Sequence, residues 1–195
     1  MTARAFAAIA GARLRAERRS LVFACASAAI VGFVQSHAFS LEAPLFFCST
    51  IGIAVALLQG PGRHAYLDVT ERSAPLFGRE LARAKALAPV VSATLATLIC
   101  WAAQFLSGFA MPVATFVEAL ACAIASTLVA LNATTRSGAG RFVALGSAAA
   151  TIVAAYLLAK SGGAAGAATE SIACAIVGFV ALLQYGESLA RYDPL

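Results

Sequence analysis

The feature that most constrains this chain is a series of apolar blocks, each about 20 residues long, the length a helix needs to cross a bilayer. Only 12% of the residues are charged and 61% are hydrophobic, whereas about 25% of the residues in a soluble domain are charged. The pattern therefore predicts an all-α bundle whose apolar surface is buried in lipid.

The blocks divide into six predicted transmembrane helices within a single membrane domain of 195 residues. The predicted spans are residues 21–39, 43–60, 89–108, 112–133, 142–159 and 171–186. The third and fourth spans share a charge-free stretch, in which Ser107, Gly108 and Pro112 supply the break. We expect residues 1–20 to form an interfacial helix with its apolar face, including Phe6 and Ile9, toward the membrane. Residues 160–170 are expected to form a loop, in which the Gly-rich segment 161–168 is a flexible turn or a shallow re-entrant segment.

The positions of Lys and Arg predict the orientation of the bundle. Cytoplasmic loops of membrane proteins carry an excess of these residues. Of the 14 Lys and Arg residues, only Lys160 falls on the side opposite to the others. We therefore expect a multi-pass protein of the inner membrane with both termini in the cytoplasm.

The segment 61–88 is the longest polar region and contains most of the residues whose role can be interpreted from the sequence. Ser73 is suited to cap a helix, Pro75 is tolerated in a first turn, and Pro89 is expected to set the start of the third span. The segment predicts an amphipathic helix at the cytoplasmic surface. Its predicted partner-docking residues are Glu71, Arg72, Phe77, Arg79, Glu80, Arg83 and Lys85. Alternatively, the helix is only a basic anchor that fixes the topology.

This arrangement resembles the permease subunits of ABC-2 type exporters. The resemblance lies in the interfacial helix, the six spans, the short external loops and the stretch from Glu71 through residues 77–85 to Pro89. It implies an elbow helix at 4–19, a coupling helix at 71–85, a separate cytoplasmic ATPase subunit, and a homo- or heterodimer of permeases. Ser73 stands, with Ala74 and Pro75, where those permeases commonly have Gly-Thr.

The sequence carries no sign of catalysis or of nucleic-acid binding. There is no G-x-x-x-x-G-K-[ST] motif, so ATP hydrolysis is expected only on a partner subunit, and the chain is not expected to be an enzyme by itself. The basic residues are not interleaved with aromatic residues, so no nucleic-acid partner is predicted. No cofactor or metal is predicted either. The five cysteines lie one in each of five apolar blocks, without ligand spacing, and are interpreted as small buried hydrophobic residues.

Glu118 is the one carboxylate within a predicted span. It lies six residues after Pro112, which places it roughly 9 Å below the outer end of the fourth span. A carboxylate at this depth must face the bundle or water, or be protonated. The candidate partners of Glu118 are Gln104, Gln35, His37 and Lys160. Glu118 and Gln104 are predicted as part of a possible translocation path, and packing near the headgroups is the alternative. Two further functional classes remain open, a small membrane scaffold or assembly protein and a secondary transporter or channel.

Overall fold

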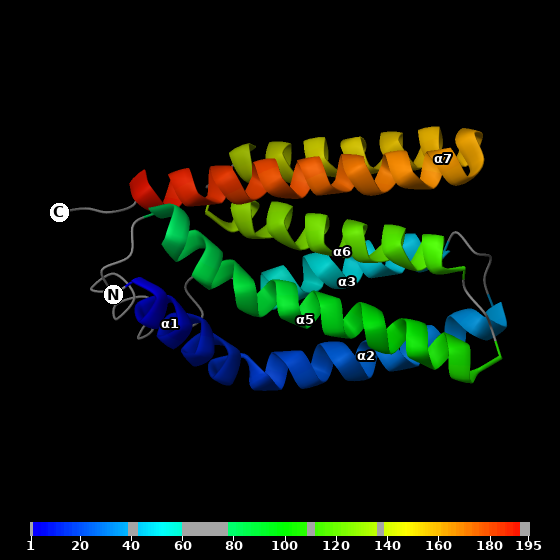
Figure 1. Ribbon diagram of the computed structural model, residues 1–195, viewed down its shortest axis with the longest axis horizontal. Coiled ribbons are helices and arrows are strands. Elements are labelled where there is room, and N and C mark those ends of the chain that lie inside the picture. Colours follow the sequence, from blue (N-terminus) through cyan, green and yellow to red (C-terminus); the bar gives the residue numbers. More distant parts are fainter. Residues whose placement is uncertain (1, 39–42, 60–77, 109–111, 136–138, 192–195) are drawn as a thin grey trace.

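The computed structural model describes residues 2–38, 43–59, 78–108, 112–135 and 139–191, and every element in these ranges is helical. The elements are α1 (Thr2–Ala16), α2 (Arg18–Ala38), α3 (Ala43–Leu58), α5 (Gly78–Leu106), α6 (Val113–Thr134) and α7 (Ala139–Arg191). The predicted all-α class is therefore confirmed for the described part of the chain. Figure 1 shows α1, the start of α5 and the C-terminal end of α7 at the same end of the bundle.

The N-terminal helix α1 packs on protein, which corrects the expectation that its apolar face meets the membrane. Ile9 and Ala10 are buried, and Ile9 belongs to a cluster with Ala84 of α5, against which Phe6 and Leu81 pack. The apolar faces of α1 and of the start of α5 therefore cover each other, because each removes the other's apolar surface from water.

The described part of the segment expected to form a separate surface helix, residues 78–88, is instead the first part of α5. This helix runs for 29 residues from Gly78 to Leu106 and contains Pro89, which was expected to begin a new helix. Proline removes one backbone hydrogen bond from a helix interior, but Pro89 is fully buried and Ala88 beside it is 0% exposed. Packing around these residues holds the helix together through the proline.

The break between α5 and α6 lies where the sequence predicts it. The amide of Gly108 donates to the carbonyl of Phe105, and Gly108 has a φ of 83°, a left-handed conformation that glycine adopts readily at helix ends. Pro112 then precedes the first residue of α6. Ser107, Gly108 and Pro112 therefore separate two helices that carry no charged residue at the junction.

The last element, α7, has 53 residues, and a straight helix of that length would measure about 80 Å. Figure 1 shows instead that the chain reverses direction between the yellow part of α7 and its orange-to-red part. The backbone of residues 161–168 is helical, so this reversal is made without the irregular turn expected there. Alanine has the highest helix propensity of all residues, and the segment is rich in it.

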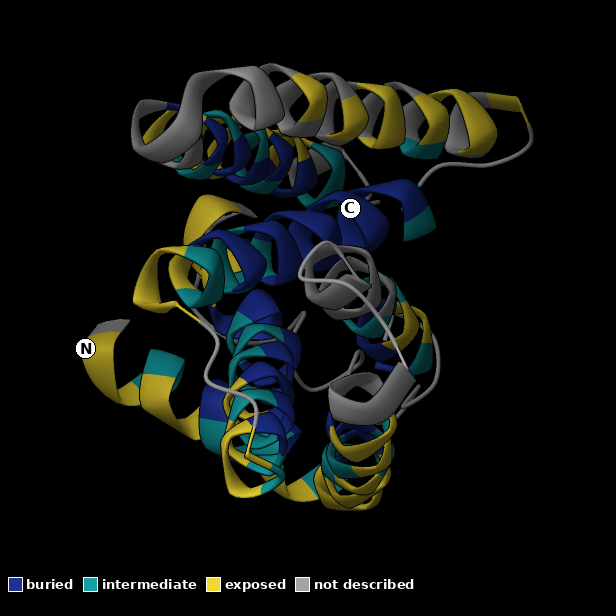
Figure 2. Cartoon of the chain, turned by 90° about the vertical axis from the view of Figure 1, so that its right-hand side faces the viewer, coloured by how far each residue is buried: buried dark blue, intermediate teal, exposed yellow. Residues whose placement is uncertain are grey.

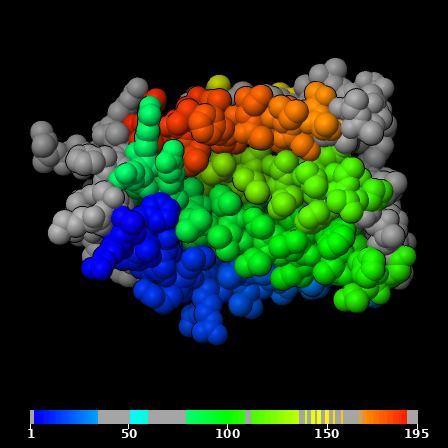
Figure 3. Space-filling view, viewed as in Figure 1, coloured from blue at the N-terminus to red at the C-terminus, as the bar shows by residue number. Residues whose placement is uncertain are grey.

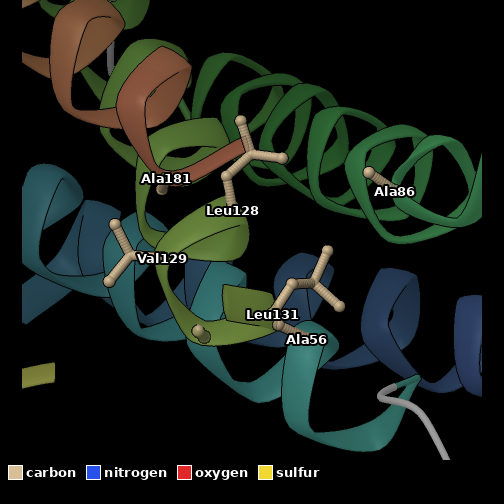
Figure 4. Close-up of a cluster of buried hydrophobic side chains, with 7 residues drawn as sticks. Ala56, Ala86, Leu128, Val129, Leu131 and Ala181 are labelled. Carbon is tan, nitrogen blue, oxygen red and sulfur yellow. The ribbon is translucent and has the colours of Figure 1, made fainter. Parts of the chain in front are cut away.

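The centre of the bundle is α6, which contacts α3, α5 and α7, while α2 packs on α5. Figure 2 shows dark, buried residues concentrated on these inner helices. The main core cluster joins Ala56 of α3, Ala86 of α5, Leu128 and Leu131 of α6, and Ala181 of α7, as Figure 4 shows. Small side chains therefore dominate the contacts, and the helix backbones approach closely.

The exterior of the bundle is apolar, which is the reverse of a soluble protein. Side chains more than half exposed include Phe23 and Phe33 on α2, Phe105 on α5, and Ile172 and Phe179 on α7. Within the described residues, three stretches are long and apolar enough to cross a membrane, namely Arg79–Leu106, Val113–Thr134 and Ala168–Leu189. Large exposed apolar surfaces mark contact with lipid or with another protein.

Candidate functional site

The predicted docking residues that the structure describes lie at the N-terminal end of α5. Arg79, Glu80 and Arg83 are exposed, whereas Lys85 is buried with an exposure of 7%. Arg79 and Arg83 are four residues apart, so they share one face of the helix. Glu71, Arg72 and Phe77 lie outside the described residues. We call Arg79, Glu80 and Arg83 the α5 end surface.

The α5 end surface is held by neighbours from both ends of the chain. A Cβ atom at Gly186 of α7 would lie 3.3 Å from Cα of Arg79 and 3.6 Å from Cβ of Ala82, so α7 approaches α5 closely here. On the other side α1 contacts α5 through Ile9 and Ala84. Figure 3 shows the start of α5 between α1 and the end of α7. This end of the bundle is therefore one packed unit of three helices.

Charged side chains of α1, of the α1–α2 junction and of α5 are also buried. Arg13, Glu17 and Lys85 are 3%, 2% and 7% exposed, respectively. Oε2 of Glu17 also accepts a hydrogen bond of 3.1 Å from the Ser20 hydroxyl. Because buried charges are stable only when paired or hydrogen-bonded, the junction of α1, α2 and α5 depends on the charges of these residues as well as on apolar packing.

A second polar cluster lies between α6 and α7. Glu118 of α6 is 8% exposed and Glu170 of α7 is 1% exposed, and their charges are within electrostatic reach of each other. The thiol of Cys122 donates to Oε1 of Glu170 over 3.6 Å. The sulfur atoms of Cys122 and Cys174 are 2.9 Å apart. We call these four residues the carboxylate–thiol cluster.

Close packing of α6 against α7 holds the carboxylate–thiol cluster together. Cys174 and Gly178 lie four residues apart on one face of α7. A Cβ atom at Gly178 would be 3.3 Å from Cα of Ala125 on α6, and Ala125 joins Cys122 and Cys174 in one buried cluster. Glycine at position 178 therefore permits the short distance at which the two thiols meet.

The second predicted path residue, Gln104, is also buried, with an exposure of 1%. It lies two residues before the end of α5, at the end of the bundle where α6 begins. Trp101 of α5 stacks on Phe116 of α6 with ring centroids 5.0 Å apart, so α5 and α6 are in contact at the level of Glu118. The structure thus places both predicted path residues inside the bundle near one end.

Sequence reasoning missed Glu170 because it assigned this residue to a loop. A helical pattern was nevertheless present. Glu170, Cys174 and Gly178 recur every four residues and are buried, while Ile172 and Ile176 between them are exposed. In a membrane helix, small and polar residues on one face and aliphatic residues on the other indicate which side faces protein. This pattern, with polar and small residues inside and aliphatic residues outside, would have identified Glu170 as a buried residue of a helix.

The carboxylate–thiol cluster can accept, hold and release protons, and its two thiols can be oxidised. Within the described ranges, no group of three or more His, Cys, Asp or Glu residues has an arrangement that could hold a metal ion. No protein-family model, curated protein or solved structure matches this chain. A function for the chain is therefore argued from its own residues.

Proposed function

We propose that this chain is the membrane-spanning subunit of an exporter of the ABC-2 type. In this proposal, six spans cross the inner membrane, both termini lie in the cytoplasm, and two permease subunits form a dimer. ATP is hydrolysed on a separate cytoplasmic subunit that docks on the α5 end surface. The substrate is not specified by these residues, because the bundle interior is mostly aliphatic.

The observation that carries the proposal is the continuity of α5. Exposed Arg79 and Arg83 lie on the same helix as the apolar stretch that ends at Leu106. Force applied to the α5 end surface therefore acts directly on a helix long enough to cross the bilayer. A loop between a docking helix and a span would absorb part of that motion, whereas a continuous helix transmits it.

The proposed orientation places the end of the bundle that carries α1 and the start of α5 in the cytoplasm. The charged residues at this end support it. Arg4, Arg15, Arg18 and Arg19 are exposed on α1 and at the start of α2. Figure 1 shows α1 at the same end of the bundle as the start of α5, where Arg79 and Arg83 add two further exposed charges. An excess of Arg on one side is typical of the cytoplasmic face, and Arg residues also suit an acidic cleft on a partner.

The docking proposal is tested by purifying the tagged chain in mild detergent from its native host. We expect an ATP-hydrolysing subunit to co-purify in stoichiometric amounts and to be lost on the double reversal Arg79→Glu and Arg83→Glu. The matched control is Arg15→Glu with Arg18→Glu, which makes the same change in net charge away from the α5 end surface. Absence of an ATPase under gentle conditions, or equal loss in the control, would count against the exporter and favour a scaffold.

A secondary transporter is a second candidate, which the burial of two neighbouring carboxylates favours. Glu118 and Glu170 are both buried in stretches long and apolar enough to cross a membrane, and such residues mark ion or proton pathways. A transporter of this kind would work without an ATPase. Proton uptake into vesicles that contain only this chain, abolished by Glu118→Gln and Glu170→Gln, would support it over the exporter.

A further inference from the structure

Cys122 and Cys174 form a contact that neither functional candidate uses. Their sulfur atoms are 2.9 Å apart, although 52 positions separate the two residues in the sequence. Each residue is 1% exposed and carries a free thiol. A disulfide needs two sulfur atoms about 2.05 Å apart and Cβ atoms about 3.8 Å apart. The two sulfur atoms therefore need to move by less than one ångström to form a bond.

Two further features adapt this pair for oxidation. The thiol of Cys122 donates to Oε1 of Glu170 over 3.6 Å, and this hydrogen bond orients its sulfur atom beside that of Cys174. Gly178, one turn after Cys174, holds α7 against Ala125 of α6. The thiol of Cys174 is therefore already in contact with Cys122 when Cys122 is oxidised, and it can complete the disulfide.

We propose that Cys122 and Cys174 are a peroxide-sensitive dithiol whose oxidation ties α6 to α7 by a disulfide. The thiolate form of Cys122 attacks one oxygen of hydrogen peroxide, which breaks the O–O bond. The hydroxide that leaves takes up the proton that the thiol lost and becomes water, so Cys122 becomes a sulfenic acid.

The thiol of Cys174 then attacks the sulfenic sulfur, forms the S–S bond and releases a second water. Two electrons pass from the two sulfur atoms to the peroxide, which is reduced to two waters. Hydrogen peroxide is small and uncharged, so it can enter an apolar helix interface that excludes larger reagents. The proposal does not depend on the exporter or on any transport activity.

The test treats the reduced, full-length chain in detergent with hydrogen peroxide and then denatures it. We expect the number of titratable thiols to fall by two from the five in the sequence. Mass spectrometry after proteolysis should find the peptide that contains Cys122 joined to the one that contains Cys174. Cys122→Ser and Cys174→Ser should each abolish the disulfide. Cys100→Ser is the matched control, because Cys100 is 2% exposed on α5, and it should leave the disulfide intact.

Two further variants test the geometry while keeping both thiols. Glu170→Gln removes the negative charge beside Cys122 but keeps a hydrogen-bond acceptor, so the thiolate forms more readily and disulfide formation should become faster at neutral pH. Gly178→Leu should separate α6 from α7 and reduce the yield of disulfide at a fixed time. Each variant is first checked for the helical content and elution volume of the unaltered chain.

Several results would overturn the proposal. They are oxidation of Cys122 to a sulfinic or sulfonic acid without a disulfide, pairing of either cysteine with another thiol, and disulfide formation only after denaturation. Slower disulfide formation in Glu170→Gln than in the unaltered chain would contradict the placement of the carboxylate beside Cys122.

Discussion

Nδ2 of Asn132 on α6 donates a hydrogen bond of 2.8 Å to Oε1 of Gln184 on α7. Asn132 is 3% exposed, and its Oδ1 atom accepts no hydrogen bond from the residues that the structure describes. A similar contact joins Nε2 of Gln59, just after α3, to the hydroxyl of Ser92 on α5 over 3.0 Å. Side-chain hydrogen bonds thus connect helices whose other contacts are made mainly by small apolar residues.

The hydrogen bond between Asn132 and Gln184 should contribute measurably to stability. Hydrogen bonds between helices in membranes contribute about 0.6 kcal/mol on average and up to about 1.7 kcal/mol. In a double-mutant cycle with Asn132→Ala and Gln184→Ala, we expect a coupling energy of about 1 kcal/mol. The coupling energy is measured by unfolding the purified chain and its variants in mixed micelles with increasing concentrations of a denaturing detergent. Strictly additive single effects would show that the contact contributes nothing.

The close approach of α3 to α6 should make Gly52 intolerant of even one methyl group. A Cβ atom at this position would collide with the carbonyl oxygen of Ala123 and the hydroxyl of Ser126. We expect Gly52→Ala to lower the unfolding free energy by about 1–3 kcal/mol. Gly146→Ala is the control, since a Cβ there meets nothing within 4 Å, and it should be neutral or slightly stabilising. Equal stability of the two variants would contradict this packing.

The two ends of α5 should be labelled from opposite sides of the membrane. Arg83 is exposed near the start of the helix, and Leu106, at its last position, is 84% exposed. In a chain whose five native cysteines are replaced, a membrane-impermeant maleimide should reach Arg83→Cys only from the cytoplasm. Leu106→Cys should react only from outside. Labelling of position 83 in intact cells would reverse the proposed orientation.

Glu118 should be required for transport but not for assembly. Glu118→Gln keeps the shape of the side chain and its hydrogen-bonding capacity but removes the charge, so folding should be preserved. We expect transport to fall to background once a substrate is known, while the elution volume and any bound partner stay unchanged. The adjacent variant Val117→Ala is the control, because Val117 is 48% exposed on the same helix. Unchanged transport in Glu118→Gln would assign the carboxylate to packing.

Local patterns in the sequence were sufficient to predict the helical class and the break between α5 and α6. A long charge-free stretch needs a turn to fit a bilayer, and Ser107, Gly108 and Pro112 are residues that supply one. Glu118 was expected to face the bundle or water, or to be protonated, with Gln104 as a candidate partner, and the structure buries both side chains. These predictions depend only on the residue types within one segment, and not on its contacts with other segments.

The wrong predictions concern contacts between segments that are distant in the sequence. Pro89 was expected to begin a helix, but packing by α1 and α7 keeps α5 helical on both sides of it. Glu170 was placed in a loop, yet α7 buries it beside Cys122. The sequence around Pro89 or Glu170 does not indicate which distant residues pack against it. The carboxylate–thiol cluster could therefore not be predicted from the sequence.

The alanines that fill the core restrict how any route through this chain could open. Ala56, Ala86 and Ala181 meet around α6, and a methyl group has no rotamers through which it could swing aside. These alanines therefore cannot act as a gate of turning side chains, and the larger buried side chains at this level, Leu128, Val129 and Leu131, all belong to α6. Separating the contacts that the alanines make would require whole helices to slide or tilt apart as rigid rods.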